Sequence, residues 1–282
     1  MDLDAIREWK PTVEQSYGAR DSMLYALGLG YGEDPLDAKE LQFVYERDLR
    51  AVPTMAMVLA QNRFWLSEPK YGVDAVRLLH AEQSLEIHQP LASEGRVQAA
   101  FQVSGVDDKG ADRGALLHQT KTLSDAESGA PLASIRYTLM LRGNGGQGGF
   151  GETVEPPPPL PDRAADRTAE IPTARRAALL YRLSGDYNPL HADPAVAGEA
   201  GFDRPILHGL CTMGIACRAI LANYCDNDPV RLAGLSNRFT QPVFPGETLK
   251  FEFFEEAGLV RYRGTAVERG TVVLDRGSAR IR

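Results

Sequence analysis

Two patterns of apolar residues run through this chain, and they predict different elements. Segments 54–66 and 209–224 carry apolar residues on most faces of a helix, which predicts two buried helices. Segments 247–256 and 259–268 alternate apolar and polar residues, as antiparallel strands with one buried face do. Runs rich in β-branched and aromatic residues predict further strands at 95–104, 115–125, 131–142 and 271–282.

These elements occur twice in the same order. Segment 16–28 resembles 180–194, which places Asp21 opposite Asp186. Segment 51–60 resembles 206–216, and 87–103 resembles 239–255, where Gln-Pro occurs in both. Three matching blocks in one order indicate a duplicated domain. We therefore predict an α+β protein in which each half is one buried helix wrapped by an antiparallel sheet.

A segment rich in glycine and proline separates the two halves. Residues 143–161 contain 6 glycines and 5 prolines, a composition typical of a linker that is flexible at first and then extended. The predicted organisation is an N-terminal domain at 1–142, a linker at 143–165 and a C-terminal domain at 166–282.

Composition and charge limit the possible functions. The chain has 31 basic and 38 acidic residues and a formal charge of −7, which argues against a general nucleic-acid-binding protein. It has no signal-peptide pattern and no apolar run of about 18 residues, so we expect a cytoplasmic protein without a membrane span. The three cysteines, none in a CxxC motif, are expected to be buried reduced thiols.

The candidate chemistry lies in residues 181–194, YRLSGDYNPLHADP. Asp186 and His191 are five residues apart, about 140° around a helix, and Pro189 between them disfavours helix. The stretch is therefore a turn that gathers polar groups. Asp193 and Pro194 are typical of a helix start. A metal site built from Asp186, His191 and Asp193 is disfavoured, because the chain has only 5 histidines and no HxH or HExxH motif.

This turn, together with PILHGLCTMG and RFTQPVFPGETL further along, resembles the (R)-specific enoyl-CoA hydratase family, also called hydratase 2 or MaoC-like. The first half, with LQFVYERDLRAVPTMAMV, resembles the N-terminal half of its two-domain members, including the hydratase part of peroxisomal multifunctional enzymes of β-oxidation. The resemblance implies a double hot dog fold. It also implies a hydro-lyase of fatty acid metabolism that reversibly hydrates trans-2-enoyl-CoA, with no cofactor beyond the CoA of the substrate, and a homodimer.

The resemblance also implies roles for particular residues. Asp186 and His191 match the pair that holds the catalytic water, Asn188 matches an orienting amide, and Gly209 matches the backbone donor to the thioester oxyanion. Five further positions are candidates for substrate binding: Tyr181, Arg182, Arg238, Met55 and Ala56. The last two are small or flexible apolar residues that could line a cavity for the acyl tail. For Tyr181 and Arg182 a supporting role is equally open, and Arg238 could simply face water.

In the first half the matching positions have changed. With Asp21 opposite Asp186, Met23 and Ala26 replace Asn188 and His191, which predicts a single active site, in the second half. Beside that site, His208 is expected to pack at the loop-to-helix junction. Two alternative functions stay open: an acyl-CoA thioesterase on the same fold, and a non-catalytic acyl-CoA binder.

Overall fold

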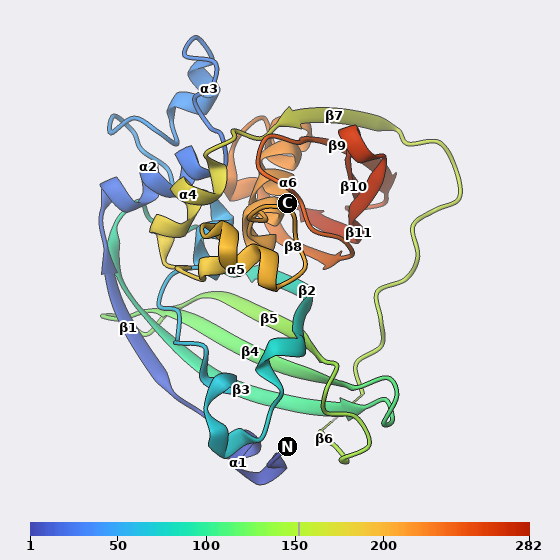
Figure 1. Ribbon diagram of the computed structural model, residues 1–282. Helices are drawn as coiled ribbons and strands as arrows, with labels where there is room; N and C mark the ends of the chain where they lie inside the picture. The colour runs from blue at the N-terminus through green and yellow to red at the C-terminus, as the bar shows by residue number, and fades with distance from the viewer. Residues whose placement is uncertain (152) are drawn as a thin grey trace.

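The computed structural model describes residues 1–151 and 153–282. In it, one antiparallel sheet runs through both halves of the chain (Figure 1). Its strands in the first half are β1 (Thr12–Tyr17), β2 (Leu78–Ile87), β3 (Gly95–Asp108), β4 (Ala115–Asp125), β5 (Pro131–Leu141) and the short β6 (Phe150–Gly151). Those in the second half are β7 (Arg167–Pro172), β8 (Leu232–Phe239), β9 (Thr248–Glu256), β10 (Leu259–Ala266) and β11 (Thr271–Ile281).

The strand order shows the duplication directly. The sheet runs β1-β3-β4-β5-β2 through the first half and continues β8-β11-β10-β9-β7 through the second. Counted outward from the junction between β2 and β8, the two halves have the same strand order. The two halves join where β2 pairs antiparallel with β8, with Gln83 opposite Asn237. The predicted duplicated α+β architecture is confirmed.

Some of the helices lie against this sheet, and others project from it (Figure 1). The α-helices are α1 (Leu3–Glu8), α2 (Ala19–Gly28), α3 (Ala38–Leu41), α4 (Ala177–Tyr181), α5 (Pro194–Glu199) and α6 (Gly209–Tyr224). The 3-10 helices are η1 (Pro53–Met57), η2 (Trp65–Ser67), η3 (Pro69–Tyr71), η4 (Ala75–Arg77), η5 (Arg182–Ser184), η6 (Pro189–His191), η7 (Pro229–Arg231) and η8 (Val267–Arg269). None of the helices in the described part of the chain has the length and apolar character needed to cross a lipid bilayer.

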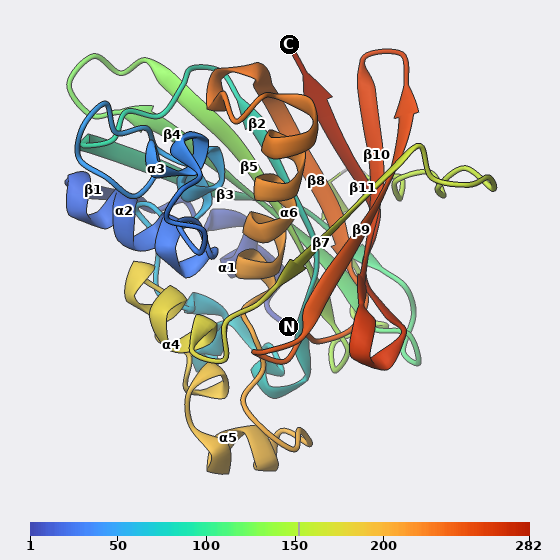
Figure 2. The same cartoon turned by 90° about the horizontal axis from the view of Figure 1, so that it is seen from above.

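The prediction of a central helix is confirmed for the second half and is wrong for the first half. Helix α6 lies beside the strands of the second half, and its cysteines Cys211 and Cys217 are buried free thiols (Figure 2). In the first half, the segment 54–66 holds only the five-residue η1, a turn at 58–60, irregular chain and the start of η2. Ala60 has a positive φ of 47°, a left-handed conformation that cannot continue a helix. Uniform apolarity correctly predicted burial of this segment, but burial did not require a regular helix.

Part of the predicted linker belongs to the sheet of the first half. Strand β6 pairs with β3, and the Asp108 carboxylate accepts hydrogen bonds from the N–H groups of Gly146 and Gly148, both at 2.7 Å. Further along, the carbonyl of Pro158 accepts a hydrogen bond from Arg261 at 2.7 Å. The glycine-rich part, predicted to be flexible, is thus bound to the fold.

The structure also changes how the two halves align. Helices α2 and α4 each follow the outermost strand of their half and pack together, with the rings of Tyr25 and Tyr181 5.7 Å apart. Both tyrosines stand in a Leu-Tyr-x-Leu sequence, and matching these sequences places Gly30 opposite Asp186. The alignment of Asp21 with Asp186 is therefore wrong. Asp21 instead lies in the first turn of α2 and accepts a hydrogen bond from the Gly18 N–H at 2.8 Å.

Candidate functional site

The predicted turn is ordered by its own side chains. Asp186 follows η5, and its carboxylate accepts a hydrogen bond from the Asn188 N–H at 3.2 Å. The Asn188 side chain caps η6 by accepting from the Leu190 N–H at 3.1 Å. Asp193 caps α5 by accepting from the Ala195 N–H at 2.8 Å, as its sequence position predicted. The turn thus fixes Asp186 ahead of η6, whose last residue is His191.

His191 is held in one tautomer. Its side chain is buried, and Nδ1 lies 2.9 Å from the carbonyl oxygen of Ile206. A carbonyl can only accept, so Nδ1 carries the proton and the Nε2 lone pair is free to act as a base. Ligand atoms of Asp186, His191 and His208 all lie within 4.8 Å of one another. The structure therefore brings the predicted Asp–His pair together and adds a second histidine.

His208 supports this pair. Its ring stacks on that of His191 with centroids 3.7 Å apart, and its Nε2 donates to the Asp186 carbonyl oxygen at 3.1 Å. Its Nδ1 is buried and has no hydrogen-bond partner among the described residues. The predicted packing role thus extends to a direct hydrogen bond to the backbone of Asp186.

Both histidines favour the neutral form. Burial lowers the pKa of His191, an effect that the nearby Asp186 charge opposes. Burial, followed by the neighbouring His191, lowers the pKa of His208 to about 4. Burial therefore favours the neutral form of both histidines, and their stacking disfavours a charge on both at once.

Gly209 begins α6, directly after His208. The first N–H groups of a helix have no acceptor within the helix, and they lie at the positive end of its dipole. A Cβ added at Gly209 would lie 3.3 Å from Cε1 of Phe239, closer than most packed side chains. The glycine therefore exposes a backbone donor beside the Asp–His pair and leaves room for the Phe239 ring.

A cavity of about 280 Å³ adjoins the catalytic turn. One wall comes from the second half and includes Leu183, Gly185 and Tyr187, which flank Asp186 in sequence. The opposite wall comes from the first half, and its residues are Gln15, Asp21, Leu24, Met55, Val58, Leu59 and Gln61. Met55 therefore lines a cavity whose walls come from both halves, and its contact with an acyl tail stays a prediction.

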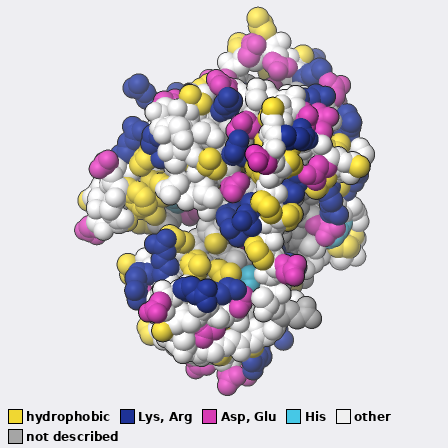
Figure 3. Space-filling view, turned by 90° about the vertical axis from the view of Figure 1, so that its right-hand side faces the viewer, with side chains coloured by type: hydrophobic (Ala, Val, Ile, Leu, Met, Phe, Trp, Pro, Cys, Tyr) yellow, Lys and Arg dark blue, Asp and Glu magenta, His cyan; other side chains and the backbone are white. Residues whose placement is uncertain are grey.

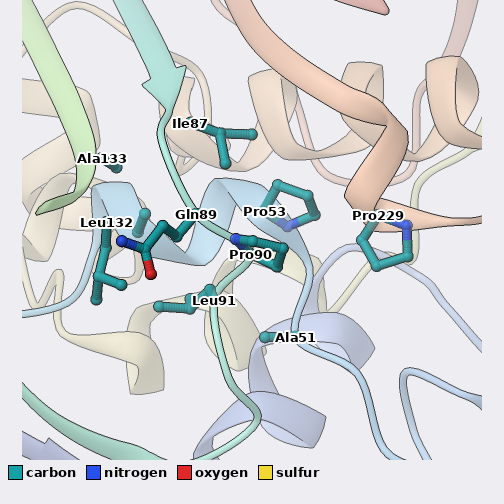
Figure 4. A pocket seen from close by; sticks show the side chains of 10 residues that line it. Ala51, Pro53, Ile87, Gln89, Pro90, Leu91, Leu132, Ala133 and Pro229 are labelled. Carbon is teal, nitrogen blue, oxygen red and sulfur yellow. The ribbon is translucent and has the colours of Figure 1, made fainter. Parts of the chain in front are cut away.

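Ala56 lines a different and much smaller cavity (Figure 4). This apolar space of about 20 Å³ lies between η1, which begins at Pro53, and the Gln89-Pro90 turn of the first half. Pro229 of the second half also lines it. It has room for about one small molecule such as water. The prediction that Ala56 shares the cavity of Met55 is wrong, because neighbouring residues of a 3-10 helix point in different directions.

The other three predicted substrate residues differ in position. Tyr181 is 1% exposed and packs beneath His208 with ring centroids 5.1 Å apart, so it supports the site from below and cannot contact substrate as placed. Arg238 forms an ion pair with Glu82 at 2.6 Å across the β2–β8 junction, which occupies its guanidinium. Arg182 lies over the Tyr187 ring at 5.0 Å, beside the cavity, and its substrate-binding role stays a prediction.

One nearby residue, His80 on β2, was missed by the sequence reasoning. Its ring lies 4.9 Å from that of Phe239, and its buried Nε2 has no partner among residues 1–151 and 153–282. Burial lowers its pKa to about 4, while the charge of Asp186 acts in the opposite direction. A single histidine in a strand has no spacing that would signal this proximity, since pairing of β2 with β8 creates it.

Comparisons with known proteins identify the family of the chain. Residues 158–276 match the family described as MaoC like domain, and residues 15–143 match the MFE-2 hydratase 2 N-terminal domain. The chain is 38% identical to enoyl-CoA hydratase 2, peroxisomal, of Arabidopsis thaliana over 94% of this chain and 90% of that protein.

Solved structures resemble the fold as well. A MaoC-like dehydratase from Phytophthora capsici superposes with a TM-score of 0.88 at 34% identity, covering 100% of this chain and 99% of that one. A Mycobacterium tuberculosis protein described as a double hotdog fold has a TM-score of 0.54 at 17% identity, covering 97% of this chain and 94% of that one, which bears on the fold alone. The chain belongs to the MaoC-like hydratase 2 family and has its double hot dog fold.

Proposed function

We propose that this protein reversibly adds water to a trans-2-enoyl-CoA and gives an (R)-3-hydroxyacyl-CoA. The protein is a hydro-lyase of the hydratase 2 family. The observation that carries the finer proposal is the convergence of Asp186, the free Nε2 of His191 and the N-terminus of α6 in one place. The (R) configuration rests on the resemblance of the turn to the (R)-specific family.

The chemistry requires a held water. Water accepts from and donates to polar groups, so the Asp186 carboxylate and the lone pair on His191 Nε2 can bind its two protons. The water oxygen bonds to the β-carbon as the C=C electron pair shifts toward the thioester. The Asp186–His191 pair takes the proton that the water loses and returns one proton to the α-carbon, so the net change is addition of H₂O. A positioned acid–base group typically contributes about 10²–10⁴-fold to the rate.

The negative charge that moves onto the thioester oxygen needs a donor. The Gly209 N–H is suited to this, because it lies at the start of a 16-residue helix and no side chain blocks the thioester. Asn188 already caps η6, so its proposed contribution is to hold the turn that aims Asp186. The acid–base pair and the oxyanion donor come from consecutive parts of the second half.

The remaining surfaces suit the two ends of an acyl-CoA. The cavity beside Asp186 has apolar residues such as Met55, Val58 and Leu59 for part of an acyl tail. One face of the molecule is hollowed, and hydrophobic side chains lie there beside Lys and Arg side chains (Figure 3). Such a surface suits a ligand with apolar segments and anionic phosphates. As in the sequence prediction, we propose a homodimer that needs no further cofactor.

Asp186, His191 and His208 also present three metal-ligating groups, with His208 in place of the predicted Asp193. Their geometry favours water over a metal. Each imidazole lone pair lies in the plane of its ring, and the two rings are stacked 3.7 Å apart at an angle of 28°, so the lone pairs lie in separate and nearly parallel planes. A tetrahedral site requires lone pairs that converge on one point.

One assay separates the proposal from its alternatives. The protein is mixed with crotonyl-CoA, and three quantities are followed: loss of enoyl-thioester absorbance, free thiol, and the configuration of the product. We expect absorbance loss, no free CoA and the (R)-3-hydroxy product, also in the presence of EDTA. Release of free thiol would support the thioesterase instead, and unchanged substrate with saturable binding would support a non-catalytic binder.

A further inference from the structure

A fully buried lysine lies behind the wall of the cavity that adjoins the catalytic turn. Lys121 on β4 is 0% exposed, and no carboxylate contributes to its pKa, which burial alone lowers to about 7. A lysine in this setting is costly, because removing an ammonium group from water without an opposite charge is unfavourable. It therefore calls for a role that an apolar residue could not fill.

The lysine bonds to the segment that replaced the central helix of the first half. Its Nζ donates to the carbonyl oxygens of Ala56 and Met57, both at 3.1 Å, and of Leu59 at 2.5 Å. A continuous helix would use such carbonyls for i to i−4 bonds, but here the chain leaves η1 and turns at Ala60. A protonated lysine has three N–H donors, which matches the three buried carbonyls.

The other side of this segment faces the cavity. Met55, Val58 and Leu59 form its wall in the first half, opposite the residues that flank Asp186. Tyr137 makes a weaker bond to the same segment, its hydroxyl donating to the Met57 carbonyl at 3.3 Å. The position of the wall is thus set by donors beneath it, and Lys121 supplies most of them.

We propose that Lys121 is a positioning residue that determines which acyl groups the protein accepts. It acts through the segment 55–59, whose carbonyls it gathers, and it touches neither substrate nor the Asp–His pair. Without it, the carbonyls of Ala56 and Leu59 would lose their donor, whereas that of Met57 would keep Tyr137 and Gln61, and the segment would shift into or away from the cavity. Long acyl chains, which fill the cavity, should respond much more than short ones. The proposal rests on the proposed function only for the identity of the ligand.

Binding of non-reactive ligands tests this directly. Calorimetry gives the dissociation constants of decanoyl-CoA and butyryl-CoA for the wild type and for Lys121→Met. We expect the ratio of the decanoyl constant to the butyryl constant to rise at least tenfold in the variant. This ratio is insensitive to the fraction of protein that is folded, because both ligands see the same sample. An unchanged ratio would overturn the proposal.

Two further variants guard the interpretation. Tyr137→Phe removes only the weaker bond and should shift the ratio in the same direction by a smaller factor. If Lys121→Met does not fold, an unchanged ratio in Tyr137→Phe overturns the proposal. Val260→Ala trims a buried residue of the second half and should leave the ratio unchanged. A shift there equal to that of Lys121→Met would show that any loss of stability moves the wall, and would also overturn it.

The wild type separates this proposal from the proposed function. If it binds decanoyl-CoA and shows the Lys121 effect but does not hydrate crotonyl-CoA, the proposed reaction fails and the positioning role stands. If it hydrates crotonyl-CoA but the ratio is the same in all variants, the reaction stands and the positioning role fails. A wild type that binds neither acyl-CoA contradicts both.

Discussion

His191 and His208 stack with their ring centroids 3.7 Å apart, and each ring donates one N–H to a main-chain carbonyl. The two carbonyls belong to Ile206 and to Asp186 itself, so the backbone fixes both tautomers. The arrangement leaves the His191 Nε2 lone pair free near the Asp186 carboxylate. A neutral histidine beside a carboxylate is a suitable environment for removing a proton from water.

The pH dependence of the rate should reflect this neutral state. Protonation of His191 at Nε2 would remove its lone pair, so activity is lost as pH falls through its pKa in the folded protein. Burial lowers that pKa below 6.5. We therefore expect the decline of kcat/KM for crotonyl-CoA on acidification to be centred below pH 6.5. A decline centred above pH 6.5 would mean that the histidine is not held neutral.

Replacing Gly209 separates its packing role from its catalytic one. Gly209→Ala places a methyl group 3.3 Å from the Phe239 ring, on the residue whose backbone N–H is proposed to bind the thioester oxygen. The substitution keeps the backbone N–H but crowds the thioester that it is proposed to bind, so we expect kcat to fall by up to about 10²-fold, the range in which loss of an oxyanion contact begins. The double variant Gly209→Ala/Phe239→Leu relieves the contact with the ring but leaves the methyl group near the thioester. Its turnover should stay low, and recovery of wild-type turnover would limit Gly209 to packing.

Filling the cavity should select against long substrates. Val58→Phe adds bulk to the wall of the 280 Å³ cavity. It should spare crotonyl-CoA and lower kcat/KM for trans-2-decenoyl-CoA by at least tenfold, about 1.4 kcal/mol. Ala56→Phe is the matched control, since Ala56 lines the separate small cavity. It should affect both substrates equally, and a selective effect there would place the tail in the small cavity instead.

The buried Lys121 should also make the free energy of unfolding depend on pH. The pKa of Lys121 is lowered to about 7, whereas an unfolded lysine has a pKa of about 10.4. Between these values the unfolded chain binds a proton that the folded chain does not, so the free energy of unfolding contributed by this residue rises with pH. Urea unfolding at pH 7.5, 8.5 and 9.5 gives the free energy of unfolding of both proteins. The value for wild type minus the value for Lys121→Met should rise by up to about 1.4 kcal/mol per pH unit. A pH-independent difference would contradict a lowered pKa of Lys121 in the folded protein.

Much of the fold could be predicted because burial leaves a periodic pattern. Helix α6 and strands β9, β10 and β11 follow the apolar pattern of the sequence closely. The first half departed from expectation at η1, where apolar residues indicated burial but carried no sign of the turn at Ala60. That turn depends on Lys121 and on Gln15, whose side chain accepts from the Ala60 N–H, and both are distant in sequence.

The site was predicted in part for a similar reason. Asp186 and His191 lie in one short motif, so their proximity is a local property of the turn. The position of His208 against them depends on how the chain before α6 folds back on that turn. Likewise, Ala56 and Met55 are neighbours in sequence, but the tight geometry of η1 directs them into two different cavities. Contacts of this kind are set by tertiary structure, so no residue spacing in the sequence predicts them.

The central claim is that Asp186 and His191 together activate water for addition to an enoyl-CoA. The most direct measurement is the initial rate of crotonyl-CoA hydration, followed at the enoyl-thioester band, for wild type, Asp186→Asn, His191→Gln and the double variant. Each single variant should lose about 10²–10⁴-fold in kcat with its fold intact, and the double variant should lose far less than the product of the two losses. Wild-type turnover in either single variant, or losses that multiply, would contradict a pair that acts as one unit.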